Sequence, residues 1–233
     1  MISDIDYFWQ WERVTKYIFS LEDGKLRMGI ILKGVLITIK ISIVAFVIAT
    51  MLGVIFAVFR ISNYRSLRIF GFVYVETIRN TPLLVQILFS YFIISHIFDL
   101  DGFYVAVVTL SLFEGAYIAE IVRGAIVSIE RGQWDAGTAL GMNRFKLLRY
   151  IIFPQALPSI IPPLGNILVT TVKDSSLLSV ISIYELTFQA QKIVSETFLT
   201  FEIWFLVALI YFLINIIIIR LLRYFEKYLE VSR

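Results

Sequence analysis

The sequence predicts an all-α protein that crosses a membrane several times. Hydrophobic residues make up 59% of the chain and the mean hydropathy is +0.83, whereas soluble domains are roughly 45–50% apolar. The apolar runs are long enough to cross the hydrocarbon, which takes ~20 helical residues, and they lack the alternation of a membrane barrel. Lipid offers no hydrogen-bond partners, so each span must be a helix that satisfies its own backbone.

The N-terminal residues 1–28 mix aromatic side chains with charges of both signs. Aromatic residues of this kind settle at the membrane–water interface, so we expect an interfacial segment containing a helix, with a frayed tail as the alternative. The opening MISDIDYFWQWERV lacks the basic stretch that begins a cleavable signal peptide.

Five apolar segments follow, and prolines distinguish the fourth. The expected spans are about 29–59, 69–98, 103–129, 155–172 and 201–222. The fourth is short and contains Pro158, Pro162 and Pro163, each of which removes a backbone donor. We therefore expect a broken or kinked helix that is buried against other subunits. Residues 173–200 form a polar-to-amphipathic connection to the last span.

The basic residues define an orientation. The turn at 60–68, the stretch at 130–153 and the C-terminus are rich in Lys and Arg, and five spans place them on one side. The loop at 95–102 lies on the other side and contains two aspartates but no Lys or Arg. Because basic residues concentrate in cytoplasmic loops, we expect the N-terminus outside and the C-terminus inside.

Composition also excludes several classes of site. The chain has no cysteine, which excludes disulfides, thiol catalysis and zinc–thiolate sites. A net charge of +3, with the basic residues beside apolar segments, indicates topology and not nucleic-acid binding. There is no Gly-x-x-x-x-Gly-Lys-Ser/Thr loop for ATP phosphates, and no His, Asp or Glu cluster has the spacing of a metal site.

The polar stretch WDAGTALGMNRFKLLRYIIFP, residues 134–154, lies between apolar segments. Its first part suits a short amphipathic helix over 133–140, and Gly141 suits the position just after a helix end. Small side chains at Ala136, Gly137 and Gly141 permit another surface to approach closely. The plain alternative is a loop helix that rests on the membrane surface.

The spacing within this stretch resembles the cytoplasmic EAA loop of permease subunits of ATP-binding-cassette (ABC) importers. The pattern is Asp-Ala-Gly at 135–137, Gly141 after three residues, and Ile-x-Phe-Pro at 151–154 after nine more. The family has Glu-Ala-Ala and Ile-x-Leu-Pro at these places, so the spacing is intact while three residue types differ. Other blocks resemble polar amino acid permeases: YVETIRNTPLLVQ (74–86), AYIAEIVRGAI (116–126), GQWDAGTALG (132–141), FPQALPSIIPPLGN (153–166), KDSSLLSVI (173–181) and ELTFQAQKI (185–193).

The resemblance implies a five-span permease of the type I ABC importer kind in the bacterial cytoplasmic (inner) membrane. Its implied partners are a second permease subunit, identical or paralogous, two ATPase subunits that bind ATP and Mg, an extracytoplasmic solute-binding protein and membrane lipid. No cofactor is implied in this chain, and no catalytic residue. The implied divisions are an interfacial segment at 1–28, a permease domain at 29–225 with its coupling loop at about 130–153, and a cytoplasmic tail at 226–233.

The resemblance also assigns a role to the short helix, which would sit in a groove of the ATPase. The ATPase-coupling residues are then Gln133, Trp134, Asp135, Ala136, Gly137, Ala139, Leu140 and Gly141. Glu120 and Arg123, three residues apart on the preceding span, can pair along one face. They either anchor the base of the loop or form an ordinary salt bridge at a helix end.

Charged residues within the spans suggest a substrate path, since such residues usually face a cavity or a partner. An amino acid zwitterion needs a cation for its carboxylate and an acid or carbonyls for its ammonium. The candidates are Glu76, Arg79, Thr81, Glu114, Lys173, Asp174 and Ser175. Pro82 frees a backbone carbonyl near the first three.

Each candidate also has a structural explanation. Glu76 and Arg79 can neutralise one another, and Lys173 with Asp174 can hold an external gate or a subunit interface. Glu114 can select cationic substrates, or it can pair with Arg79 or with the partner permease.

Two other functions fit a polytopic chain. An ion-gradient-driven secondary transporter of small polar solutes usually has broken helices in both halves, whereas the prolines here cluster in one half. A membrane scaffold needs no helix of small residues at fixed spacing. Dependence of transport on ATP or on an ion gradient separates the first alternative from an importer.

Overall fold

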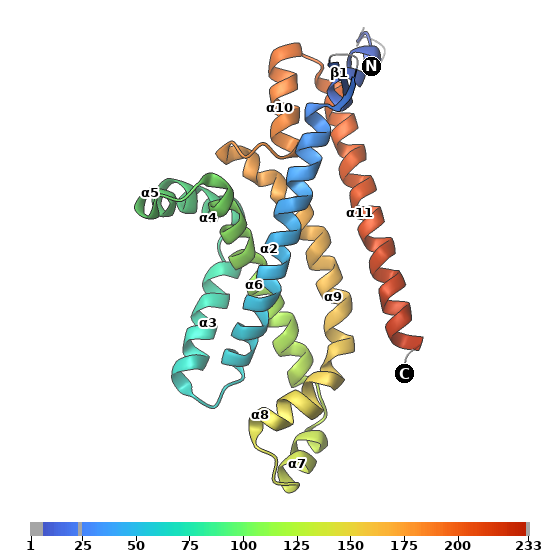
Figure 1. Ribbon diagram of the computed structural model, residues 1–233. Helices are drawn as coiled ribbons and strands as arrows, with labels where there is room; N and C mark the ends of the chain where they lie inside the picture. Colours follow the sequence, from blue (N-terminus) through green and yellow to red (C-terminus); the bar gives the residue numbers. More distant parts are fainter. Residues whose placement is uncertain (1–6, 23–24, 232–233) are drawn as a thin grey trace, which may run out of the picture.

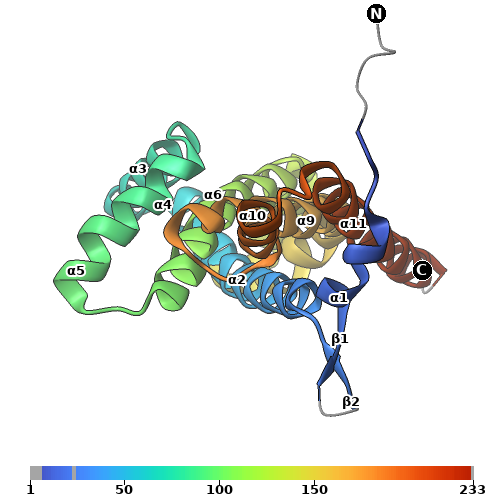
Figure 2. The ribbon, with the colours of Figure 1, turned by 90° about the horizontal axis from the view of Figure 1, so that it is seen from above.

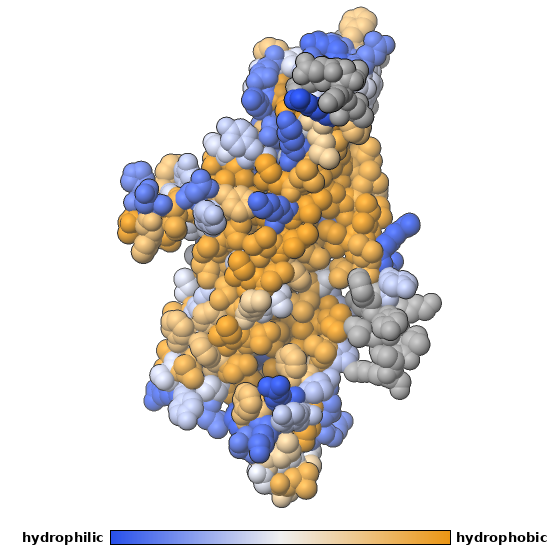
Figure 3. Space-filling view, in the orientation of Figure 1, coloured by the Kyte–Doolittle hydropathy of each residue, from blue (hydrophilic) through white to orange (hydrophobic). Residues whose placement is uncertain are grey.

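The computed structural model describes residues 7–22 and 25–231, and it confirms a helical membrane protein. Four helical segments are long and apolar enough to cross a membrane, or five if one sharply bent pair counts as a span. Apolar side chains form a broad belt around the middle, and hydrophilic residues gather toward both ends (Figure 3). This belt is what a bilayer requires of the protein surface.

The centre of the bundle is the pair α2 (Ile30–Arg60) and α6 (Gly102–Val127), close to the expected first and third spans. Small residues recur every four positions along the buried face of α2: Ala45, Ala49, Gly53 and Ala57. A Cβ on Gly53 would lie 2.4 Å from Cγ2 of Ile118 on α6. Small residues let membrane helices approach closely where apolar packing must supply the attraction.

The expected second span is not one straight helix. α3 (Arg65–Arg79) is followed by α4 (Leu83–Phe89), π-helical η2 (Ser90–Ile94) and α5 (Ser95–Phe98), and the two arms meet at 104°. Pro82 precedes the second arm with an extended ψ of 137°, and a proline also disfavours helical backbone at the residue before it. α4 packs on the bundle through Leu83 and Ile87, and the arm then extends outward to α5 (Figures 1 and 2).

The expectation of a broken fourth segment is wrong. α9 (Phe153–Asp174) is continuous, with Pro158, Pro162 and Pro163 inside it. It is preceded by α8 (Arg144–Leu147) and π-helical η3 (Leu148–Ile152), and the apolar run reaches Ile181. Proline fixes φ near the helical value, and packing on both sides holds the helix: Ile160 is buried in one core cluster, and a Cβ on Gly165 would lie 2.8 Å from Leu222 of α11.

The remaining elements cap the two ends. η4 (Ser175–Ile181) and α10 (Leu186–Thr197) follow α9, and the last span is α11 (Thr200–Val231). α7 (Arg131–Ala139) and α8 lie at one end of the molecule, with α10 and the N-terminal segment at the other (Figure 1). The basic turn after α2, the stretch around α7 and the end of α11 lie toward the same end, as the charge pattern required.

The N-terminal segment differs from the helix that we expected. Its described part contains the short η1 (Trp11–Arg13) and α1 (Thr15–Ile18), followed by an antiparallel hairpin of β1 (Phe19–Glu22) and β2 (Lys25–Met28) that pairs Phe19 with Met28. The Asp-Gly pair that follows Glu22 in the sequence favours a turn joining two strands, and Phe19 favours a strand over a helix. The expected N-terminal segment and tail fall partly outside the described residues, at 1–6 and 232–233.

Candidate functional site

The stretch at 130–153 that we expect to contact an ATPase, called the coupling loop below, is built on a short helix followed by a glycine. α7 ends at Ala139, and Gly141 follows with φ +72°. The amide of Gly141 donates to the Thr138 carbonyl at 2.9 Å, and the amide of Met142 donates to that of Gly137 at 3.1 Å. This left-handed glycine and its bonds end the helix as the sequence indicated.

The small residues of α7 serve two different surfaces. Gly137 is buried, and a Cβ there would lie 2.2 Å from Cδ1 of Leu147 in the same chain. The close approach expected of a partner at this glycine is therefore made by α8. Asp135, Ala136, Ala139 and Leu140 are exposed, with Leu140 at 79%, so they form the outer face of the loop.

Polar contacts and packing tie this loop to the spans. Gln155 on α9 donates from Nε2 to Oε1 of Gln133 at 3.0 Å, and Trp134 packs on the core cluster around Ile126. The guanidinium of Arg144 donates to Asn63 Oδ1 and to the Ile61 carbonyl, both in the turn after α2. These contacts join the loop to α6, to α9 and to the turn after α2.

Glu120 lies at the centre of an ion-pair network near the same end. It pairs with Arg123, as expected from the spacing, and also with Arg60 at the end of α2. Arg60 is 3.6 Å from Glu76 on α3. Arg60 could not be recognised as a partner from the sequence, because it lies 60 positions from Glu120.

The expected pairing of Glu76 with Arg79 is wrong. Glu76 contacts Arg60 and accepts from Asn80 Nδ2 at 3.2 Å, while the guanidinium of Arg79 lies over the Tyr117 ring, 5.3 Å from its centre. Residues three apart share a face, but these two side chains find partners on different helices. Arg79 is thereby held against α6.

The carbonyls near Pro82 are not free for a ligand, contrary to our expectation. Gln86 Nε2 donates to the Ile78 carbonyl at 2.8 Å and to the Thr81 carbonyl at 3.1 Å. The Thr81 hydroxyl donates to the Thr77 carbonyl at 2.8 Å. Gln86 thus caps the broken helix, a role visible only once the 104° bend is known.

Glu114 lies in the middle of α6 and is almost fully buried, with 1% of its surface exposed. Its Oε1 has no hydrogen-bond partner among the described residues. Thr171 and Asp174 of α9 lie close enough to interact with its side chain. The expected pairing of Glu114 with Arg79 is therefore absent, and the structure instead brings two carboxyl groups together across the α6–α9 contact.

The three candidate residues at the end of α9 differ in burial. Lys173 is exposed, Asp174 is partly buried, and Ser175 is buried with its hydroxyl donating to the Val172 carbonyl at 2.8 Å. Glu114 and Asp174 thus form one acidic site, and Glu76, Arg79 and Thr81 lie on the bent pair. Thr171 was missed because a threonine in an apolar helix carries no signal of its own.

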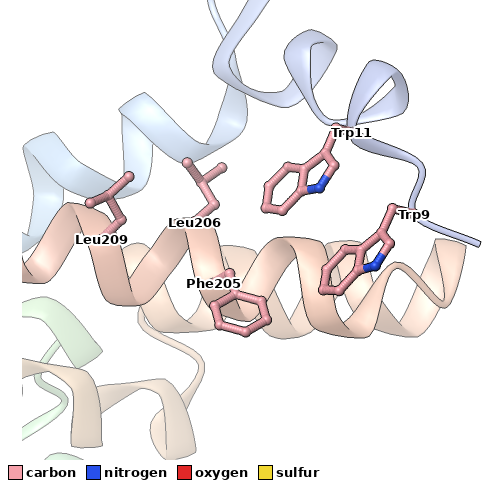
Figure 4. Close-up of a pocket in the computed structure, with 5 residues that line it drawn as sticks. All are labelled: Trp9, Trp11, Phe205, Leu206 and Leu209. Atoms are coloured by element: carbon pink, nitrogen blue, oxygen red, sulfur yellow. The ribbon is translucent and has the colours of Figure 1, made fainter. Parts of the chain in front are cut away.

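An apolar hollow of about 760 Å³ lies between the N-terminal segment and α11. Trp9 and Trp11 stack with ring centres 5.8 Å apart and lie above Phe205, Leu206 and Leu209 (Figure 4). The described residues that line it are all apolar, so a zwitterion finds no charged partner among them. Tyr7 donates to Glu202 nearby, and this bond raises the pKa of the Tyr7 phenol.

Residues 49–231 match the family described as the binding-protein-dependent transport system inner membrane component. The chain belongs to this family. It is 44% identical over 162 residues to the glutamine transport system permease protein of Escherichia coli K12, covering 68% of this chain and 74% of that protein. It is 38% identical over 196 residues to a probable glutamine ABC transporter permease protein of Bacillus subtilis 168, covering 84% of this chain and 91% of that protein.

Solved structures agree. An amino acid ABC transporter crystallised with histidines has a chain that superposes with a TM-score of 0.79 at 34% identity, covering 85% of this permease and 94% of that chain. A chain of the methionine ABC transporter MetNI, in an inward-facing conformation, superposes with a TM-score of 0.66 at 21% identity, covering 83% of this permease and 95% of that chain. This match shows a similar fold. The resemblance to ABC importer permeases and the type I importer-like helical fold are thus confirmed for this multi-pass inner-membrane permease.

Proposed function

We propose that this permease carries polar amino acids through an ATP-driven importer, taking them from an extracytoplasmic binding protein. The observation that carries the proposal is the family's coupling loop, held rigidly at one end of a membrane bundle by Gly137 and Arg144. Family membership and the glutamine permeases among its relatives support the substrate class.

The proposed assembly contains this chain, a second permease subunit that is identical or paralogous, and two ATPase subunits that bind ATP and Mg. The chain itself needs no cofactor and performs no hydrolysis. The coupling residues act through the exposed face of Asp135, Ala136, Ala139 and Leu140, while Gln133, Trp134, Gly137 and Gly141 fix the shape and position of that face.

The proposed orientation places α7 and the C-terminus in the cytoplasm and the N-terminal segment outside. Basic residues concentrate near α7 and the end of α11, which favours the cytoplasmic side for that end. The proposed divisions remain the interfacial segment 1–28, the permease domain 29–225 with its coupling loop at 130–153, and the tail 226–233.

Reconstitution tests this function directly. The permease, its ATPase and the binding protein are placed in proteoliposomes, and uptake of radiolabelled glutamine is measured with ATP inside and without any ion gradient. We expect uptake that requires ATP and the binding protein. Uptake driven by a proton or sodium gradient without ATP would instead support a secondary transporter.

The acidic pair indicates a more specific candidate substrate, a cationic amino acid. Glu114 and Asp174 lie together in a largely buried place, and Glu114 Oε1 has no partner in the described part of the chain. Burying a charge is costly without compensation, so a positive substrate group suits this site. Thr81 and Arg79, on the neighbouring bent pair, are the proposed polar lining for the carboxylate, and Lys173 and Ser175 border the acidic pair.

Competition uptake tests this assignment. Glu114→Gln should reduce arginine uptake roughly tenfold, the effect of about 1.4 kcal/mol, with glutamine uptake little changed. Glu76→Gln is the matched control, because Glu76 contacts Arg60 outside the acidic pair. Equal loss of both substrates in Glu114→Gln would assign Glu114 a structural role.

A further inference from the structure

A second cavity lies where the spans meet the coupling loop. It has a volume of about 500 Å³ and is walled by the end of α2, the end of α6 and the segment around α7. Among the described residues that line it, none is acidic and four are arginines: Arg60, Arg123, Arg131 and Arg144. Such a wall attracts an anion.

The charge in this cavity is only partly compensated. Arg60 and Arg123 share Glu120 behind the wall, and Arg60 also approaches Glu76. Arg144 donates to neutral oxygens only. Arg131 is exposed and makes no hydrogen bond or ion pair within the part of the chain that the structure describes. Two guanidinium groups therefore remain available to a ligand.

The position and the lining of the cavity indicate which kind of anion it can bind. Arg60 is the last residue of α2, and Arg123 is one turn before the end of α6. Apolar side chains complete the wall: Ile61, Ile126, Val127, Ile129 and Trp134. The cavity thus lies where two spans end and the segment around α7 begins, with cationic and apolar parts side by side.

We propose that this cavity binds the phosphate of an anionic lipid of the cytoplasmic leaflet, such as phosphatidylglycerol or cardiolipin. Guanidinium groups bind phosphate oxygens with paired donors, and basic pockets between spans on this side suit such headgroups. A free phosphate has the same charged chemistry, but it leaves the apolar wall without a partner. The proposal rests on the cytoplasmic placement of α7 proposed above.

A headgroup bound here contacts three parts of the coupling apparatus at once. Arg60 belongs to α2, Arg123 to α6, and Arg131 to the first turn of α7. The lipid would therefore strengthen the connection between α7 and the spans, in parallel with the bonds made by Arg144. We expect coupling between ATP hydrolysis and transport to depend on anionic lipid.

The test uses the assembled importer purified in mild detergent, with native mass spectrometry after adding phosphatidylglycerol, cardiolipin or phosphatidylcholine. Arg131→Gln removes a cavity guanidinium without breaking a described contact. Arg149→Gln is the matched control, because Arg149 lies over Tyr150 outside the cavity wall. ATPase retention is measured in the same spectra, and 10 mM inorganic phosphate is added in a separate arm.

We expect anionic lipid, and not phosphatidylcholine, to bind, with about fivefold weaker binding in Arg131→Gln, the effect of one basic side chain near an anionic surface. Binding in Arg149→Gln should match the unmodified importer. Equal loss in both variants would mean diffuse attraction and overturn the site. Displacement by inorganic phosphate would overturn the lipid source, and loss of the ATPase with lipid retained in Arg131→Gln would make the cavity a protein interface.

Discussion

Gly137 is the residue on which the packing of the coupling loop depends most directly. Its missing side chain lets α7 rest on Leu147, whereas a Cβ would come within 2.2 Å of Cδ1. The EAA pattern of the family has alanine at this position. An alanine here would require the flexible end of Leu147 to shift. A β-branched side chain has no such room.

Gly137→Val should therefore displace α7 and destabilise the permease by about 1–3 kcal/mol, the usual cost of overpacking. The readout is the thermal melting temperature in detergent together with the amount of ATPase that co-purifies. Gly132→Val is the control, since nothing lies within 4 Å of a Cβ at Gly132. Similar losses in both variants would refute a specific clash with Leu147.

At Gly141, substitution is limited by the backbone conformation and not by neighbouring side chains. It has φ +72°, yet no atom lies within 4 Å of an added Cβ. Gly141→Ala should thus cost roughly 1 kcal/mol through the left-handed backbone alone, and Gly141→Asn should cost less because asparagine tolerates that conformation. Melting temperatures of the two variants check the order, and a more stable alanine variant would contradict it.

At the scale of elements, a buried carboxylate joins α10 to its neighbours. Glu185 is fully buried at the start of α10 and accepts from the amides of Thr187 at 2.9 Å and Phe188 at 2.7 Å. Tyr211 of α11 donates to it at 3.1 Å, and Thr38 of α2 lies at 3.5 Å. Burial raises the pKa of Glu185 to about 7, although the bonds to the amides oppose the rise.

This pKa predicts a pH-dependent stability. The folded chain holds the Glu185 proton up to about pH 7, while the unfolded chain loses it near pH ~4.3. The folded state thus binds more protons between these values, and its stability falls as pH rises through that window. Melting temperatures from pH 5 to 8 should decline, and Glu185→Gln should flatten the decline, with Glu196→Gln on the exposed end of α10 as control. An unchanged slope in Glu185→Gln would contradict the assignment.

Across the whole molecule, the connection between loop and spans depends on Arg144. It joins α8 to the turn between α2 and α3, 81 residues away in sequence. Under the proposed function, movement of α7 would reach these spans partly through this side chain, since Asn63 and Ile61 belong to the turn itself.

Arg144→Ala should therefore lower transport per ATP hydrolysed severalfold, because about 1 kcal/mol of bonding between the two parts is removed. The ratio of uptake to hydrolysis in proteoliposomes measures this, with Lys146→Ala as a matched loss of charge on the exposed face of α8. A proportional fall of both rates, with the ratio unchanged, would show that Arg144 supports assembly and not coupling.

Much of this architecture was predictable because membrane insertion acts on local composition. The apolar lengths located both ends of α2 and α6 and the start of α11 to within two residues, and the stretch from Asp135 to Pro154 contains the predicted short helix and the glycine after it. The N-terminal hairpin and the unbroken α9 were not predicted. Proline and aromatic content restrict the backbone only locally, and packing decides among the conformations that remain.

The sequence by itself determined the helical membrane class, the family and the place of the short helix before Gly141, since hydropathy and motif spacing are properties of contiguous residues. Only the tertiary structure decided which side chains meet. It placed Arg60 beside Glu120, Arg79 over Tyr117, and Glu114 next to Asp174. Such pairs are far apart in the chain, and the close packing of α2, α6 and α9 brings them together, whether the two groups are opposite in charge, as in Arg60 and Glu120, or alike, as in Glu114 and Asp174.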